Sequence, residues 1–280
     1  MTRDPRITAA RPDLAARALE GDVLAERFVD GTPMVVTAPV LDLTRSPDRG
    51  VALDTQLLSG EVFTVYEYDG DTGLAWGQSE TDGYVGYVSV AGLETADGPV
   101  DHVVSALATH IYPEPALKTR PLEALPMGAA FRAGPVSDGF VEVAGGGFVP
   151  AQHVARKSAF ASDPVEVAER FVGVPYLWGG RSAFGLDCSA LVQLAFAACG
   201  TALPRDSDQQ DGAIAAVAGP LQRGDLVFWS GHVGIMADGE RLVHANAHHM
   251  SVVKEPLAEA EARIAMQGEG PVTARRRVSP

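Results

Sequence analysis

The sequence predicts an α+β protein in which two small β-barrels precede a domain built of helices followed by a sheet. Short runs of β-branched and aromatic residues alternate with glycine, aspartate and proline between residues 34 and 155. From residue 163 onward, helical patterns give way to four strand-like runs. The 280 residues, 46% of them hydrophobic, are enough for two or three domains with buried cores.

The N-terminal segment, residues 1–33, is predicted to be a helical arm. Apolar residues recur at helical spacing between residues 13 and 29, and Gly21 interrupts or ends the helix. We therefore expect a helix ahead of the first barrel.

The two barrels are predicted over residues 34–98 and 99–156. In each, β-rich runs are separated by turn residues, and residues 95–99 have the composition of a linker. The run at residues 57–65 aligns with the run at residues 125–133. This similarity indicates a divergent internal repeat.

Residues 157–280 predict the helix-and-sheet domain. Its first helix begins at Pro164, with Ser162 or Asp163 as the N-cap. The second helix begins at Cys188 and is apolar almost all round, so it should be buried. Four strands of an antiparallel meander follow, at residues 225–229, 232–236, 241–245 and 251–254.

The formal net charge of −14 argues against a nucleic-acid partner, because phosphates would be repelled. An anionic membrane surface is disfavoured for the same reason, and no stretch approaches the roughly 20 apolar residues that cross a bilayer. The basic run at residues 275–277 is expected to be a solvated tail. With no visible signal peptide and no disulfide framework, we expect a soluble, cytoplasmic protein.

Cys188 is the candidate nucleophile. A thiol reacts well only when it is ionised, and a helix N-terminus and a nearby imidazole both lower its pKa. The polar neighbours Asp187 and Ser189, and the glycines ahead of them, favour a reactive thiol at this position. Cys199 lies among apolar residues at the end of the same helix and is expected to be a structural cysteine.

Two histidines, His232 and His244, meet only if the hairpin between them has a suitable register. With a three-residue loop at residues 237–239, and Gly239 in the left-handed conformation, His232 lies directly opposite His244. A two-residue Asp-Gly turn would place the rings on opposite faces. We expect the three-residue loop, because His232 can then act as base while His244 fixes its tautomer through a ring-to-ring hydrogen bond.

The run HANAHH at residues 244–249 also suggests a zinc site. His244 and His248 would share a face only on a helix, whereas this segment has the pattern of a strand and a turn. We therefore expect no metal. Asn246 is the alternative residue for orienting the base.

Taken together, these motifs resemble the NlpC/P60 family of cysteine peptidases, which has a papain-like core. The resemblance covers about residues 163–265, and the two preceding modules resemble bacterial SH3-like domains. The matching motifs are PYLWGG at 175–180, DCS at 187–189, LPRDS at 203–207, GDLVF at 224–228, HVGI at 232–235 and VHA at 243–245.

The resemblance implies a role for each matched residue. Cys188 would be the nucleophile, His232 the general base and His244 the third member of a triad, with Tyr176 beside the oxyanion. A carboxylate pair of Asp187 and Glu61 would suit a substrate ammonium group. The implied substrate contacts are Asp187, Ser189, Trp178, Ser207 and, in the first barrel, Glu61 and Tyr84 or Tyr87.

The resemblance also implies an activity that needs no cofactor. The substrate would be a murein peptide with a free N-terminal L-alanine, cleaved through a thioester at its γ-D-Glu–diamino acid bond, where the diamino acid is meso-diaminopimelate or lysine. Such an enzyme would recycle cell-wall peptides. The alternatives are a non-catalytic module that binds wall peptides or a partner protein, and an amidase or transacylase of the same fold.

Overall fold

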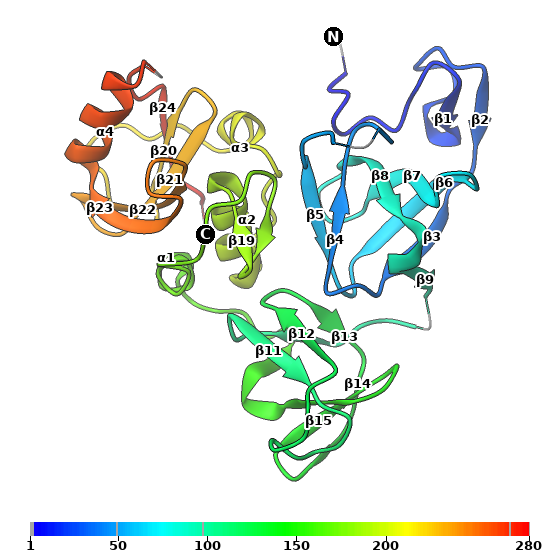
Figure 1. Ribbon diagram of the computed structural model, residues 1–280. Coiled ribbons are helices and arrows are strands. Elements are labelled where there is room, and N and C mark those ends of the chain that lie inside the picture. The colour runs from blue at the N-terminus through cyan, green and yellow to red at the C-terminus, as the bar shows by residue number, and fades with distance from the viewer. Residues whose placement is uncertain (1–2, 49, 97, 269, 280) are drawn as a thin grey trace. The chain divides into compact units, whose positions relative to one another are not determined.

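The computed structural model describes residues 3–48, 50–96, 98–268 and 270–279. The chain divides into two compact units, Met1–Lys157 and Ser158–Pro280. The first unit contains two β-barrels, and the second contains the helices α1 to α4 with their sheet (Figure 1). Among the described residues, no helix is long and apolar enough to span a bilayer.

The first barrel is formed by a five-stranded antiparallel sheet and a separate hairpin. Its core contains Leu43, Leu57 and Phe63, none of which is exposed to solvent. A short 3-10 turn, Val90–Gly92, leads into the last strand, which pairs with the first. In sheet order the strands are β8 Val85–Ser89, β7 Leu74–Ser79, β6 Val62–Asp69, β3 Thr32–Val36 and β9 Leu93–Thr95, and the hairpin is β4 Val40–Leu43 with β5 Thr55–Leu58.

The second barrel repeats this element order with shorter strands. Its last strand again follows a 3-10 turn, Ala151–His153, and again pairs with the first strand. Val104, Leu125 and Val149 lie in its core. The strands are β10 His102–Val104, β11 Ala108–Ile111, β12 Glu123–Pro126, β13 Ala130–Phe131, β14 Ala133–Ser137, β15 Phe140–Val143, β16 Phe148–Pro150 and β17 Val154–Arg156.

The two runs that aligned in the sequence occupy equivalent places. The run at 57–65 covers the end of β5 and the turn after it, and the run at 125–133 covers the end of β12 and its turn. Gly60 and Gly128 occupy these turns with φ of 83° and 91°, a conformation that favours glycine. The shared turn therefore explains the weak sequence repeat.

The predicted helical arm is wrong. The segment instead forms a parallel pair of short strands, β1 Leu14–Ala16 and β2 Arg27–Val29. All three residues of β1 are buried, and Leu14 packs in a cluster with Trp76 and Val85 of the barrel. Burial against the barrel outweighs helix propensity, which amounts to only a few tenths of a kcal/mol per residue, about 0–0.7.

The second unit contains the predicted helices and meander. Asp163 caps the first helix by accepting a 2.8 Å hydrogen bond from the Val165 N–H, and Gly200 follows the second helix with φ of 83°. The helices are α1 Pro164–Glu169, α2 Cys188–Ala198, α3 Ser207–Ala213 and α4 Leu257–Met266. The sheet order is β23 Ser251–Pro256, β22 Arg241–Asn246, β21 His232–Met236, β20 Leu226–Trp229 and β24 Ala274–Arg276, beside a small hairpin of β18 Arg181–Ser182 and β19 Gly185–Leu186.

The basic run near the C-terminus is part of this sheet, not a solvated tail. Strand β24 pairs with β20, and Arg276 bonds Asp211 at 2.6 Å. Arg277 makes two hydrogen bonds, of 2.6 and 2.8 Å, to the fully buried carboxylate of Asp225. These bonds satisfy a buried charge that would otherwise be costly.

Candidate active site

Cys188 is the first residue of α2, at the predicted position. Asp187 forms the N-cap, because its Oδ1 accepts a 2.9 Å hydrogen bond from the Ala190 N–H. The thiol is buried, with Cys188 only 7% exposed, and the backbone N–H of Val233 donates a hydrogen bond to it. The candidate nucleophile of α2 therefore contacts β21 at Val233, the residue that follows His232.

Burial opposes ionisation of the Cys188 thiol, contrary to the expected lowering of its pKa. Burial raises the pKa of Cys188 to about 12, and the charge of Asp187 adds to this. The Val233 N–H, the charge of Arg205 and the Ser189 N–H act in the opposite direction but are weaker. The expected lowering depended on the helix N-terminus and a nearby imidazole, and burial of the thiol acts against both.

The two imidazoles form the predicted ring-to-ring hydrogen bond. His232 Nε2 lies 2.8 Å from His244 Nδ1, and the ring planes are inclined at 61°. His244 is completely buried, and His232 is half-buried. In the part of the chain that the structure describes, the thiol of Cys188 makes no hydrogen bond to the ring of His232; such bonds often form only once substrate is present.

The register that joins the rings differs by two residues from the predicted one. Ile235 pairs with Val243, and the loop comprises residues 238–240. The Asp238 carboxylate accepts hydrogen bonds from the N–H groups of Glu240 and Arg241, which draws Glu240 into the turn. Gly239 has no positive φ. Because side chains alternate with a period of two, a shift of two residues leaves both rings on one face.

Gly234 makes room for this arrangement. A Cβ atom at this position would lie 2.5 Å from Leu242 Cδ1 and 3.2 Å from His244 Cβ. The absence of a side chain therefore lets β22 place His244 beside β21.

Both histidines are neutral bases near neutral pH. Burial lowers the pKa of His232 to about 3, and the charges of His244 and Arg263 act in the same direction. Burial also lowers the pKa of His244, although Glu255 opposes this shift. A buried neutral imidazole can accept a proton, so the site pairs a neutral thiol with a neutral base.

Two residues that the sequence did not single out complete the site. Glu255 Oε1 lies 2.7 Å from His244 Nε2, and Arg263 donates to both oxygens of Glu255, at 2.6 and 2.7 Å. Asn246, the alternative orienting residue, places Nδ2 3.1 Å from His244 Nε2. A Glu on β23 could be linked to His244 only once the strand register was known, so the sequence held no usable signal.

The carboxylate of Asp187 is already fully used within the domain. Oδ1 accepts hydrogen bonds from Ser189, Ala190 and Arg205, and Oδ2 accepts from Gly179 and Arg205. Arg205 has no solvent exposure and lies 2.7 Å from Oδ2. Arg205 thus compensates the charge of Asp187, and the expected contact of Asp187 with a substrate ammonium group remains a prediction.

Tyr176, Trp178 and Ser207 lie in the second unit. Tyr176 is half-buried, and its backbone N–H donates to the carbonyl of Met250 at 2.9 Å. Trp178 is 64% exposed, so its indole is available to a ligand. Ser207 is buried at the start of α3. Their expected contacts with substrate remain predictions.

The other three predicted residues lie in the first unit. The Glu61 carboxylate accepts a 2.9 Å hydrogen bond from the Leu58 N–H and so stabilises the turn after β5. Tyr84 is a core residue of the first barrel, 3% exposed, which leaves little of it for a ligand. The pairing of Glu61 with Asp187 and the role of Glu61 in closing the site remain predictions.

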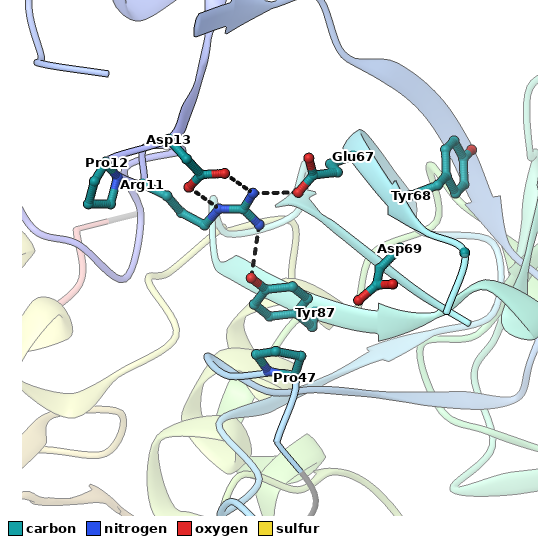
Figure 2. Close-up of a pocket in the computed structure, with 9 residues that line it drawn as sticks. Arg11, Pro12, Asp13, Pro47, Glu67, Tyr68, Asp69 and Tyr87 are labelled. Atoms are coloured by element: carbon teal, nitrogen blue, oxygen red, sulfur yellow. Dashed lines mark hydrogen bonds and ion pairs between the residues drawn. The ribbon is translucent and has the colours of Figure 1, made fainter. Parts of the chain in front are cut away.

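Tyr87 lines a polar pocket of the first barrel and contacts the N-terminal segment (Figure 2). Its hydroxyl accepts a 2.8 Å hydrogen bond from Arg11, whose guanidinium also bonds Asp13 and Glu67 and lies 4.5 Å from the centre of the Trp76 ring. The Tyr87 hydroxyl therefore already accepts a hydrogen bond from Arg11, and its expected contact with substrate remains a prediction.

Among the described residues, no three or more His, Cys, Asp or Glu side chains are grouped so that they could hold a metal ion. His248 and His249 stack edge to face, with centroids 4.8 Å apart. His249 bonds Asn246 Oδ1, so this residue supports the loop after β22.

Comparison with known families identifies two domains. Residues 173–264 match the NlpC/P60 family, and residues 43–93 match the bacterial dipeptidyl-peptidase Sh3 domain. The first match spans the segment from the loop before α2 to α4, and the second lies within the first barrel.

Relatives with curated names match about a third of the chain. The chain is 34% identical to the gamma-D-glutamyl-L-lysine dipeptidyl-peptidase of Bacillus subtilis, over 33% of this chain and 34% of that protein. It is 35% identical to dipeptidyl-peptidase 6 of Lysinibacillus sphaericus, over 34% and 36% respectively. The matches thus span about a third of the length of these relatives.

A solved structure matches most of the chain. An NlpC/P60 family protein from Bacillus cereus aligns with a TM-score of 0.74, covering 89% of this chain and 100% of that one at 20% identity. At this identity the similarity establishes the shared fold.

Proposed function

We propose that this chain, which carries an NlpC/P60 domain and a bacterial SH3 domain, is a cysteine peptidase. The single observation on which the proposal depends is the hydrogen bond between His232 and His244 beside the helix that begins with Cys188. The substrate we propose is a murein peptide with a free N-terminal L-alanine, cleaved at the γ-D-Glu–diamino acid bond. The diamino acid is meso-diaminopimelate or lysine.

The neutral thiol and the neutral imidazole favour general-base catalysis over a preformed ion pair. As Cys188 Sγ attacks the amide carbonyl carbon, His232 takes the thiol proton. The Cys188 N–H and the Tyr176 hydroxyl are the proposed donors to the developing oxyanion. The imidazolium then protonates the leaving amine, which departs and leaves a thioester. Water, deprotonated by His232, hydrolyses the thioester and regenerates the thiol.

The names of the relatives support the choice of bond, since the Bacillus subtilis protein is a gamma-D-glutamyl-L-lysine dipeptidyl-peptidase. The preference for a free amino terminus is the finer part of the proposal. Because Arg205 neutralises Asp187, the negative charge that meets the substrate ammonium should come from another residue, and Glu61 is our candidate. We also propose that the enzyme recycles murein peptides in the cytoplasm.

Defined peptides test this proposal. The protein should convert L-Ala-γ-D-Glu-meso-diaminopimelate into L-Ala-D-Glu and diaminopimelate, identified by mass spectrometry. Cys188→Ala should abolish turnover, and Cys199→Ala, the matched control, should retain it. N-acetylation of the substrate should reduce turnover. If Cys188→Ala turned over at the wild-type rate, the thiol mechanism would be excluded; equal turnover of acetylated and free peptides would exclude the terminus preference.

The high pKa of Cys188 is the observation that favours the alternative of a binding module. Iodoacetamide alkylation separates the two functions, because a thiol assisted by His232 should react faster than an unassisted one. We expect Cys188 in the wild type to react at least about tenfold faster than in a His232→Gln variant, since a positioned base contributes about 10²–10⁴-fold. Equal rates would favour the binding function. A panel of amide substrates would reveal an amidase or transacylase.

A further inference from the structure

We propose that Glu255, held in place by Arg263, is a positioning residue that fixes where the protons lie in the His232–His244 pair. Through this effect it leaves Nδ1 of His232 unprotonated as the acceptor for the thiol proton. The inference deepens the proposed thiol chemistry and depends on it for its functional meaning.

Glu255 is held as an ionised acceptor. Arg263 of α4 donates to Oε2 at 2.7 Å and to Oε1 at 2.6 Å, a two-pronged contact that suits a carboxylate. Burial would raise the pKa of Glu255, but the hydrogen bonds from His244 and Arg263 hold it below its usual range. An ionised carboxylate can only accept hydrogen bonds.

The ionised carboxylate determines the tautomer of His244. The 2.7 Å contact between Oε1 and Nε2 needs a proton, which Nε2 must supply. His244 Nδ1 is then unprotonated and accepts the hydrogen bond from His232 Nε2 at 2.8 Å. A neutral imidazole carries one proton, so His232 Nδ1 is left bare.

Asn246 is the one neighbour in the described residues that opposes this assignment. Its Nδ2 lies 3.1 Å from His244 Nε2 and would donate to that nitrogen if it were bare. The unprotonated nitrogen would then face the Glu255 carboxylate at 2.7 Å, and two acceptors at this distance repel each other because no proton lies between them. A charge-assisted bond at 2.7 Å is about twice as strong as a neutral one, so the contact with Glu255 prevails over the longer contact with the amide.

The groups around the pair come from three strands and one helix. His232 lies on β21, Asn246 on β22 and Glu255 on β23, whereas Arg263 lies on α4. The charge of His249 also influences His244. Of these neighbours, Glu255 is the one anion, so it sets the proton positions.

Nitrogen-15 NMR of histidine-labelled full-length protein tests the assignment, because protonated and unprotonated ring nitrogens give well-separated signals. The seven histidines are assigned with single His→Gln variants. In the wild type at pH 7.5, His244 and His232 should both carry the proton on Nε2. In Glu255→Met, which has no acceptor, both rings should populate the second tautomer.

The matched control is Glu169→Met. Glu169 of α1 forms an exposed ion pair with Lys254, the neighbour of Glu255 on β23, so its loss removes a charge without touching the histidines. Both tautomers should remain as in the wild type. Unchanged tautomers in Glu255→Met would overturn the proposal. If that variant does not fold, Glu255→Leu, which also lacks an acceptor, should show the second tautomer, and its absence there would be equally decisive.

Alkylation of Cys188 gives the functional readout. Iodoacetamide should react at least about twofold more slowly with Glu255→Met than with Glu169→Met, because the rate should fall with the fraction of molecules in which His232 Nδ1 is unprotonated. Equal rates would contradict the positioning role. Neither readout uses a murein peptide, so a failure to cleave peptides would count against the proposed function and leave the tautomer assignment standing.

Discussion

Replacing Arg205 with methionine should strongly destabilise the second unit. The Arg205 side chain is fully buried and donates to Asp187 at 2.9 and 2.7 Å, to Ser189 at 3.0 Å and to the Gly180 carbonyl at 3.3 Å. Methionine preserves much of the volume but none of the donors. The carboxylate of Asp187, only 8% exposed, would lose its counter-ion.

The size of the effect follows from the burial of the pair. Removing one partner of a buried ion pair costs about 3–5 kcal/mol, because it leaves an uncompensated charge. In a unit the size of Ser158–Pro280, this loss corresponds to a fall in Tm of about 10–20 °C. Arg241→Met provides the control: Arg241 pairs with Asp238 on the surface, with its side chain 54% exposed, and such pairs contribute about 0–1 kcal/mol.

Thermal unfolding, followed by calorimetry on the full chain, measures both variants. Asp187→Asn combined with Arg205→Met should cost less than the sum of the single changes, because the double variant leaves no buried charge unpaired. A loss from Arg205→Met within about 1 kcal/mol of that from Arg241→Met would refute the reasoning.

Two further predictions concern stability. The pKa of His232 is about 3 in the folded chain, so between about pH 6.5 and pH 3 the unfolded chain binds this proton and the folded chain does not. As pH falls through this range, the free energy of unfolding should therefore fall by up to about 1.4 kcal/mol per pH unit. In urea titrations, His232→Gln should flatten this slope, and an unaltered slope would contradict the assigned pKa. Gly212→Ala in α3 should raise the free energy of unfolding by about 0.5–1 kcal/mol, because alanine favours a helix over glycine and a Cβ there meets nothing within 4 Å. A lower free energy of unfolding in urea would show that the helix does not accept the methyl group.

The elements that the sequence could predict are those specified by local chemistry. The cap at Asp163 and the apolar run from Cys188 to Gly200 each specify a helix without help from distant residues. The face shared by His232 and His244 was also predictable, because it depends only on whether the register is odd or even. The register itself was missed by two residues, since the turn-forming bonds of Asp238 were not foreseen.

The missed features depend on tertiary contacts. The strand at Leu14 exists because the barrel offers Trp76 and Val85 as packing partners. The raised pKa of Cys188 depends on how much water the folded domain excludes. The contact of Glu255 with His244 requires β23 to pair with β22 and α4 to supply Arg263. No local sequence pattern predicts the strand pairing or the position of Arg263.

The position of Arg263 on the last helix of its unit bears on how the protein matures. Synthesis runs from the amino end, so a nascent chain acquires its sulfur nucleophile and both imidazoles well before the ribosome adds Arg263. Until α4 docks, Glu255 lacks the guanidinium that holds its carboxylate in place. Because the contact of Arg263 with Glu255 needs both α4 and β23, we expect the proton positions of the histidine pair to become fixed only once this helix has docked.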